Sequence, residues 1–225
     1  MQISKINIKN FRKLEDCTIS IFDKTTLFVG ANNSGKTSAM YCLMAFLGNN
    51  EKRFKITDFP LNKINLIDNF SVAWSIDEIQ NFCPTLEISL DDIQDSDLPK
   101  IKHIIPSLSW NNEEISIRLI FEPNDVDILK QKFNEYVDSI NSLLTDADDL
   151  LFPRNLWGFL KIGNNLNTFL VFKHIFWTQI QQPETSKNYL NILLMEYLKL
   201  VLYRLKEASM TLMIKAQPQQ VYRNI

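Results

Sequence analysis

The chain has 225 residues, of which 45% are hydrophobic and 22% charged, and its formal net charge is −2. This composition is ordinary for a globular protein and excludes wholesale disorder, and the charge gives no global basic field, although a local patch could still bind nucleic acid. Three cysteines are too few for a disulfide framework or a zinc cluster, so we expect a cytoplasmic protein. Charged residues interrupt the most apolar stretch, so we expect no membrane partner.

The first fifty residues predict a hairpin, a buried strand, a loop and a helix. Met1–Asn10 and Asp16–Ile21 alternate apolar with polar residues, as half-buried strands do. Thr25–Val29 is a short apolar run that is typical of a buried strand. Lys36–Leu47 has the periodicity of a helix. The residues expected on its apolar face, followed by its expected C-cap, are Met40, Leu43, Met44, Leu47 and Gly48.

Between the predicted strand and the predicted helix lies a complete phosphate-binding loop. Residues 30–37 read GANNSGKT, which matches the P-loop pattern G-x-x-x-x-G-K-[ST] in full. Gly30 and Gly35 let the backbone bend so that successive N–H groups point into one concavity, and the helix adds its positive N-terminal end. Lys36 is expected to reach the terminal phosphates, and the Thr37 hydroxyl to ligate Mg²⁺.

The loop therefore predicts binding of ATP, or a close relative, together with Mg²⁺. The chain has only five glycines, and two of them stand at the required positions, so a glycine turn that merely caps a helix is the weaker alternative. The expected nucleotide-binding residues of the loop are Gly30, Asn32, Asn33, Ser34, Gly35, Lys36, Thr37 and Ser38.

The rest of the chain predicts two more strands and two long helices. Leu86–Leu90 and Ile115–Phe121 alternate as strands, and the acidic segment DDIQDSD between them is typical of a solvated turn. Val126–Leu144 carries a helical apolar stripe. Phe152–Gln179 is rich in aromatic residues and favours a mixture of helix and strand. Ser186–Lys206 is apolar round most of its circumference, as expected for a buried helix.

The elements around the loop resemble those of one branch of the P-loop ATPases. A strand closed by Asn10-Phe11-Arg12, a second strand and then GANNSGKTS are similar to the ABC-type ATPase heads of the RecF, SMC and overcoming-lysogenization-defect (OLD) group. The Asn-Asn-Ser of the loop is especially like OLD-type ATPases, which act in DNA repair and in defence against phage. In that group the arginine that matches Arg12 lies beside the nucleotide, which implies a phosphate contact for Arg12; a surface arginine is the alternative.

The resemblance implies an α/β fold, namely the N-terminal portion of an ABC-type P-loop NTPase head with a mixed sheet and a helical insertion. Residues 1–50 would form the P-loop core, and residues 51–225 the remainder of the ATPase segment. Heads of this type need further strands, so we expect the N-terminal part of a longer ATPase. Its implied partners are a second copy or a partner ATPase subunit, with DNA as a further partner.

Two motifs of these ATPase heads are not found in the sequence. One is the signature, which resembles L-S-x-G-[EQ], and the other is a Walker B Asp-Glu that follows it on an apolar strand. Asp77 and Glu78 form the one Asp-Glu with apolar residues ahead of it, but no signature precedes them, and an ordinary strand or helix edge is the favoured interpretation. We therefore expect ATP hydrolysis only from a complete dimeric head. The alternatives are a non-catalytic module for nucleotide sensing or assembly, and a different P-loop enzyme that uses Asp77 and Glu78.

Overall fold

The computed structural model describes residues 1–21, 29, 31–47, 54–101, 105, 114–143 and 154–178. The strands are β1 (Gln2–Phe11), β2 (Leu14–Ser20), β3 (Thr85–Asp91), β4 (Ile115–Pro123) and β5 (Leu170–Thr178). The helices are α1 (Lys36–Leu47), α2 (Ile64–Ala73), α3 (Ile76–Ile79), α4 (Leu98–Ile101), α5 (Val126–Leu143), α6 (Leu156–Lys161) and α7 (Asn165–Phe169). Short 3-10 turns are η1 (Ile56–Asp58), η2 (Leu61–Lys63) and η3 (Asp95–Asp97).

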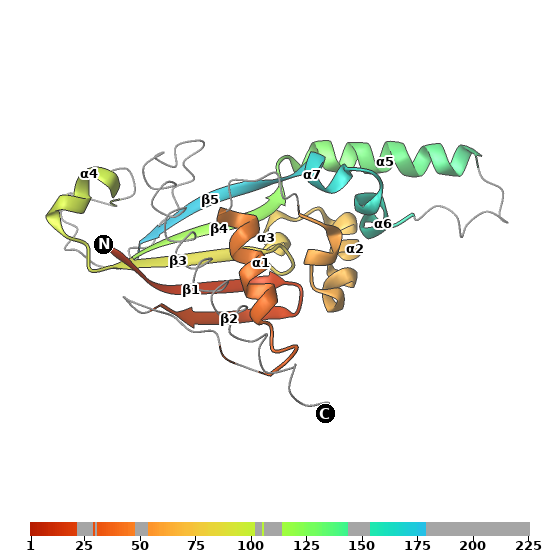
Figure 1. The fold of residues 1–225 in the computed structure, drawn as a ribbon. Coiled ribbons are helices and arrows are strands. Elements are labelled where there is room, and N and C mark those ends of the chain that lie inside the picture. The colour runs from red at the N-terminus through yellow and green to blue at the C-terminus, as the bar shows by residue number, and fades with distance from the viewer. Residues whose placement is uncertain are drawn as a thin grey trace, which may run out of the picture.

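The strands form one sheet in the order β2-β1-β3-β4-β5, and every neighbouring pair is antiparallel. Helix α1 lies across one face of this sheet, while α2, α5, α6 and α7 gather toward one end of it (Figure 1). None of the helices in the described ranges has the length and apolar character that a membrane crossing requires.

Alternating side chains give the sheet one apolar face and one charged face. Ile6 of β1 pairs with Ile88 of β3, which pairs with Ile117 of β4, and all three side chains are fully buried. Their chain neighbours point the other way, where Glu87 forms an ion pair with Arg118 at 2.5 Å. Neighbouring residues of a strand point to opposite faces, so this pattern is expected for an antiparallel sheet that covers a core on one side.

Most of the predicted elements are confirmed, and so is the α/β fold class. The two N-terminal strands, β3, β4, α1 and α5 occupy the predicted segments, and residues 154–178 combine helix and strand as expected. The described strands pair only in antiparallel fashion, so the expected mixed sheet is not found among them. The strand predicted at 25–29 is described only at Val29. That residue is 80% exposed and lies outside any strand. The predicted C-cap Gly48 and the predicted helix at 186–206 lie outside the described residues.

Helix α1 packs on β1 and β3 through a face that differs in part from the predicted one. Leu43 and Leu47 are buried as expected, but Met40 and Met44 are only half-buried. Phe46 is buried instead, and its ring meets the Phe54 ring edge-on with centroids 5.3 Å apart. The two methionines therefore flank the interface, and Phe46 lies within it.

Phe54 also fixes the segment that leads into η1. Its ring stacks on Phe121 of β4 at 4.3 Å and meets Phe11 of β1 edge-on at 6.0 Å. Paired aromatic rings stabilise a fold beyond the area that they bury. The residues that follow Phe54 are thereby held beside the C-terminal end of β1, next to the phosphate-binding loop.

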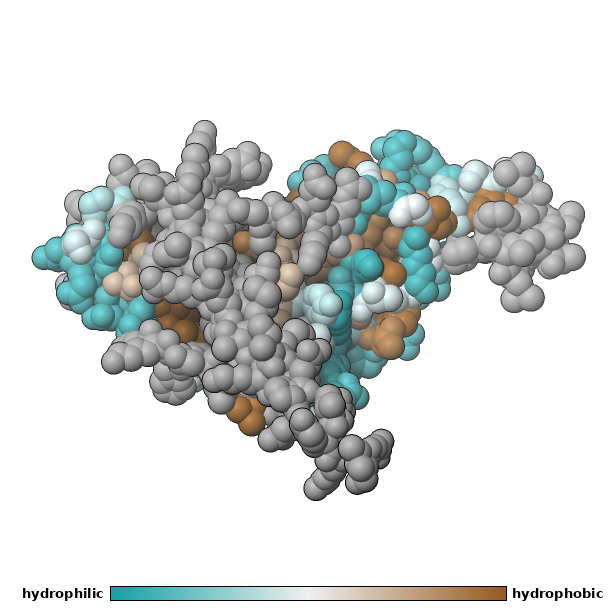
Figure 2. All heavy atoms as spheres, in the orientation of Figure 1, coloured by the Kyte–Doolittle hydropathy of each residue, from teal (hydrophilic) through white to brown (hydrophobic). Residues whose placement is uncertain are grey.

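The acidic segment between β3 and β4 is only partly the solvated turn that its composition suggests. Asp92 and Asp95 are exposed, and the described surface around η3 and α4 is largely hydrophilic (Figure 2). Asp97, however, is 9% exposed, and its carboxylate accepts a hydrogen bond from the Met1 amine at 2.6 Å. Ile93 is buried as well. A buried carboxylate needs a charged or hydrogen-bonding partner, and the amine supplies it.

Candidate functional site

The described part of the phosphate-binding loop has the sharply bent backbone that its motif predicts. Asn33 has a φ of 67° and Gly35 a φ of 102°, both in the left-handed region. The Gly35 carbonyl accepts a hydrogen bond from the Ala39 amide at 2.9 Å, which joins the loop to the first turn of α1. Left-handed residues among right-handed ones turn successive N–H groups to one side and so create an anion-binding concavity. Gly30 lies outside the described residues.

Gly35 also lies in close contact with the β1–β2 hairpin. A Cβ atom added there would lie 2.7 Å from Cδ2 of Leu14, the first residue of β2. Real Cβ atoms do not approach a carbon atom this closely. The end of the loop is therefore packed directly against the start of β2, and the β1–β2 hairpin is one wall of the site.

The loop encloses a cavity of about 310 Å³ at the N-terminus of α1. The described lining residues include two lysines and no carboxylate, so their electrostatic character favours an anion. Lys36 is folded over the loop, where its ammonium donates to the Ala31 carbonyl at 2.7 Å and to the Ser34 hydroxyl at 3.3 Å. The side chain of Thr37 is exposed. The lining residues are Lys13, Asn32, Asn33, Ser34, Gly35, Lys36, Thr37 and Ser38.

Lys13 is the member of this cavity that sequence reasoning missed. It lies in the turn between β1 and β2, and its ammonium donates a hydrogen bond to the side-chain oxygen of Asn33. The motif pattern runs through residues 30–37 alone, so it gives no signal for a residue so far upstream. Only the packing of Leu14 on Gly35 brings Lys13 to the loop.

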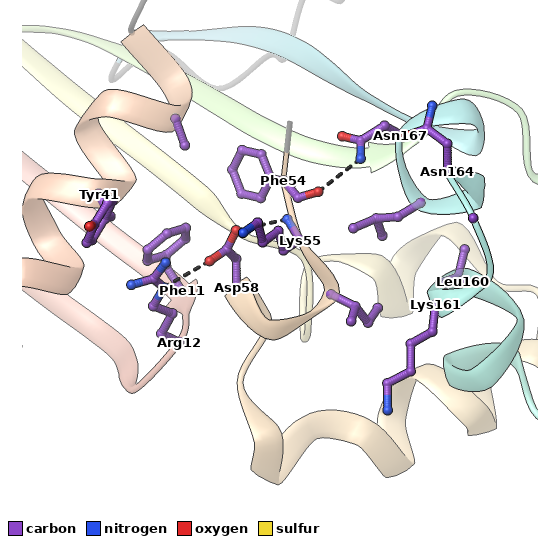
Figure 3. A pocket seen from close by; sticks show the side chains of 14 residues that line it. Phe11, Arg12, Tyr41, Phe54, Lys55, Asp58, Leu160, Lys161, Asn164 and Asn167 are labelled. Carbon is purple, nitrogen blue, oxygen red and sulfur yellow. Dashed lines mark hydrogen bonds and ion pairs between the residues drawn. The ribbon is translucent and has the colours of Figure 1, made fainter. Parts of the chain in front are cut away.

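Arg12 lies next to the loop but points elsewhere. Its Nε donates to the Asp58 carboxylate at 2.9 Å, and its guanidinium carbon lies 4.6 Å from the centre of the Tyr41 ring. Figure 3 shows this arrangement on the wall of a larger cavity of about 700 Å³. Arg12 also lines a third depression, which it shares with Lys13, Asn33 and other residues. The structure therefore brings Arg12 beside the expected nucleotide-binding residues without placing it in the loop cavity.

Asp58 is the residue that fixes Arg12. It is buried, its carboxylate also accepts from the Lys55 amide at 2.9 Å, and its carbonyl accepts from the Arg12 amide at 2.7 Å. Arg12 has a φ of 54°, which a non-glycine residue adopts at a cost, and these bonds offset that cost. The hairpin turn is thus tied to η1 by both main chain and side chain.

The thiol nearest to this cluster has a packing role. Burial raises the pKa of Cys42 well above its usual range, and the negative charge of Asp58 adds to the shift. Burial likewise raises the pKa of Cys83. A thiol with a raised pKa stays protonated at neutral pH and is a poor nucleophile. Both cysteines are free.

Asp77 and Glu78 do not form part of the site. Both lie in α3, a helix of four residues, and both are exposed. Neither side chain lines the loop cavity. The structure places them at a helix edge, one of the two ordinary positions expected for them, and the described residues give them no strand of the kind on which a Walker B pair is carried.

Comparison with known proteins agrees with this architecture. Over 170 residues the chain is 28% identical to Endonuclease GajA of Bacillus cereus (strain HuB5-5), a match that covers 62% of this chain and 24% of that protein. The chain thus spans about a quarter of the length of this relative. Residues 1–174 match the AAA ATPase domain family. The expected kinship with P-loop ATPase heads of the RecF, SMC and OLD group is confirmed at this level, and the chain belongs to the AAA ATPase domain family.

Proposed function

We propose that the chain is the ATP-binding segment of an OLD/RecF-like ATPase that acts on DNA, in repair or in defence against phage. Membership of the ATPase family supports the nucleotide. Similarity to a protein named an endonuclease, a class of enzyme that cuts nucleic acid, supports the DNA partner. The resemblance of the first fifty residues to OLD-type heads supports the biological role and a homo-oligomeric or two-subunit assembly.

The observation that carries the proposal is the cavity at the N-terminus of α1, where the lining residues that the structure describes include two lysines and no carboxylate. Phosphate oxygens would accept hydrogen bonds from the loop amides and from Lys36, whose ammonium now rests on the Ala31 carbonyl oxygen. The residues present also fit Mg²⁺, because the exposed Thr37 hydroxyl offers one oxygen ligand beside the phosphates. Mg²⁺ typically takes few protein ligands and completes its shell with phosphate and water.

A titration with Mg-ATP tests the proposal. Lys36→Ala should weaken binding at least about tenfold, because it removes a charge-assisted hydrogen bond to phosphate. Lys130→Ala is the matched control, since Lys130 is an exposed lysine of α5. Isothermal titration calorimetry of the three proteins decides the matter. Equal affinities for the wild type and Lys36→Ala would contradict the proposal.

A second candidate function is a non-catalytic module that binds partners when ATP is present. The position of Asp77 and Glu78 in an exposed, four-residue helix favours it, because they were the only sequence candidates for a Walker B pair. Sedimentation of the chain with and without Mg-ATP tests this alternative. ATP-dependent self-association without phosphate release supports the module, and steady phosphate release excludes it.

A further inference from the structure

We propose that Lys13 is a second phosphate-binding cation of this site, which the β1–β2 hairpin delivers to a loop that already contains Lys36. The proposal rests on the proposed function, because it assumes that the loop cavity takes the phosphates of a nucleotide. It concerns a residue that lies outside the phosphate-binding motif.

The hairpin turn is held in one position relative to the loop. Phe11 pairs with Leu14, so Arg12 and Lys13 form a two-residue turn. The main-chain and side-chain bonds from Arg12 to Asp58 fix one side of this turn. The contact between Leu14 and Gly35 fixes the other side against the loop. Lys13 therefore has little choice of direction at its Cα atom.

The side chain of Lys13 reaches from this turn into the cavity. Its ammonium donates to the amide oxygen of Asn33, and Lys13 itself is part of the lining of the 310 Å³ cavity. Its upstream neighbours on β1 have anionic partners, because Lys5 pairs with Glu114 at 3.6 Å and Lys9 with Glu87 at 3.4 Å. Among the residues that the structure describes, the hydrogen-bond acceptor of the Lys13 ammonium is this neutral amide oxygen.

A phosphate oxygen is the stronger acceptor of the two. The ammonium of Lys13 is charged in both bonds, but only a phosphate oxygen adds the Coulomb attraction of an opposite charge. No carboxylate among the described lining residues competes for the ammonium. Lys13 would therefore exchange Asn33 for a phosphate oxygen when nucleotide binds. The two cations come from separate elements, Lys36 from α1 and Lys13 from the hairpin.

The test separates the charge of Lys13 from its role in supporting the loop. Lys13→Gln removes the charge but keeps an N–H donor for Asn33, whereas Lys13→Arg keeps the charge. Lys130→Gln on the exposed face of α5 is the control for loss of a lysine elsewhere. Each variant and the wild type are titrated with Mg-ATP and with inorganic tripolyphosphate, which has no base or sugar, at low and at high salt. Thermal unfolding of each variant confirms that it is folded.

Lys13→Gln should bind both ligands about tenfold more weakly, and its affinity should depend less on salt, because one fewer charge attracts the phosphates. Lys13→Arg and Lys130→Gln should bind within about twofold of the wild type. If Lys13→Gln binds normally while Lys36→Ala does not, the inference is wrong and the proposed function stands. The inference is also wrong if Lys13→Arg loses as much as Lys13→Gln. If the wild type binds neither ligand, the proposed function itself fails.

Discussion

At the scale of single residues, the contact between Gly35 and Leu14 explains why loop and hairpin depend on each other. Gly35 has a φ of 102°, and a Cβ atom added there would force the Leu14 side chain to shift. Strain and steric overlap are independent costs, so a substitution at Gly35 meets both. The same contact sets the position of Lys13, which lies one residue before Leu14.

We therefore predict that Gly35→Ala lowers the free energy of unfolding by about 1–3 kcal/mol and also weakens Mg-ATP binding. Gly163→Ala is a suitable control, because Gly163 has a φ of 54° but nothing within 4 Å of the added Cβ. It should show the backbone strain alone and leave Mg-ATP affinity unchanged. Urea denaturation and calorimetric titration measure the two effects. Equal losses of affinity in both variants would count against the steric argument.

Arg12 gives a second prediction at this scale. The resemblance to RecF- and OLD-type heads implies that Arg12→Ala weakens ATP more than ADP, if the guanidinium turns toward the terminal phosphate. In the structure the same guanidinium pairs with Asp58 and lies over Tyr41. The measurement is the ratio of the two affinities in wild type and variant. An unchanged ratio would mean that Arg12 only binds Asp58 and does not contact the nucleotide.

At the scale of elements, the sequence pattern predicted the bounds of α1 but only part of its buried face. Its bounds were predicted because a phosphate-binding loop leads directly into a helix, and this signal is local. Its buried face was predicted only in part, because apolar residues occur round the whole helix and periodicity alone could not choose among them. The choice is made by Phe46, which packs on Phe54 from a later segment of the chain.

The revised face leads to a prediction about stability. Leu43→Ala should lower the free energy of unfolding by about 2–5 kcal/mol, because the side chain is fully buried between α1 and the sheet. Met40→Ala should cost clearly less, since Met40 is half-buried on the flank of the same helix. Chemical denaturation of both variants measures the difference. A larger loss of unfolding free energy in Met40→Ala than in Leu43→Ala would contradict this assignment of the buried face.

In the candidate site, too, only some of the residues could be predicted from the sequence. The loop residues 32–38 follow one another, so the motif and its immediate continuation identified them without knowledge of the fold. Lys13 and Asp58 could not be identified, because each reaches the site through a contact between distant parts of the chain. A single sequence gives no measure of which distant residues meet.

At the scale of the whole molecule, we expect the chain alone to turn over ATP negligibly. Hydrolysis needs a group that orients the attacking water, and Lys36 and Thr37 supply only charge stabilisation and a metal ligand. Release of phosphate by the purified chain should stay at background and should not change in Glu78→Gln, because Glu78 is exposed on α3. Steady hydrolysis that Glu78→Gln abolishes would overturn this prediction and the ABC-type assignment.

The position of β1 inside the sheet has a consequence for biosynthesis. On one side β1 pairs with β2, which follows it immediately, but on the other side Ile8 faces Leu86 of β3. On the ribosome, the hairpin is complete long before β3 has been translated. During that interval one edge of β1, with its unpaired N–H and C=O groups, remains a template for strands of other nascent chains. Aggregation therefore competes with folding until β3 emerges, so a chaperone that shields this edge would raise the yield of folded protein.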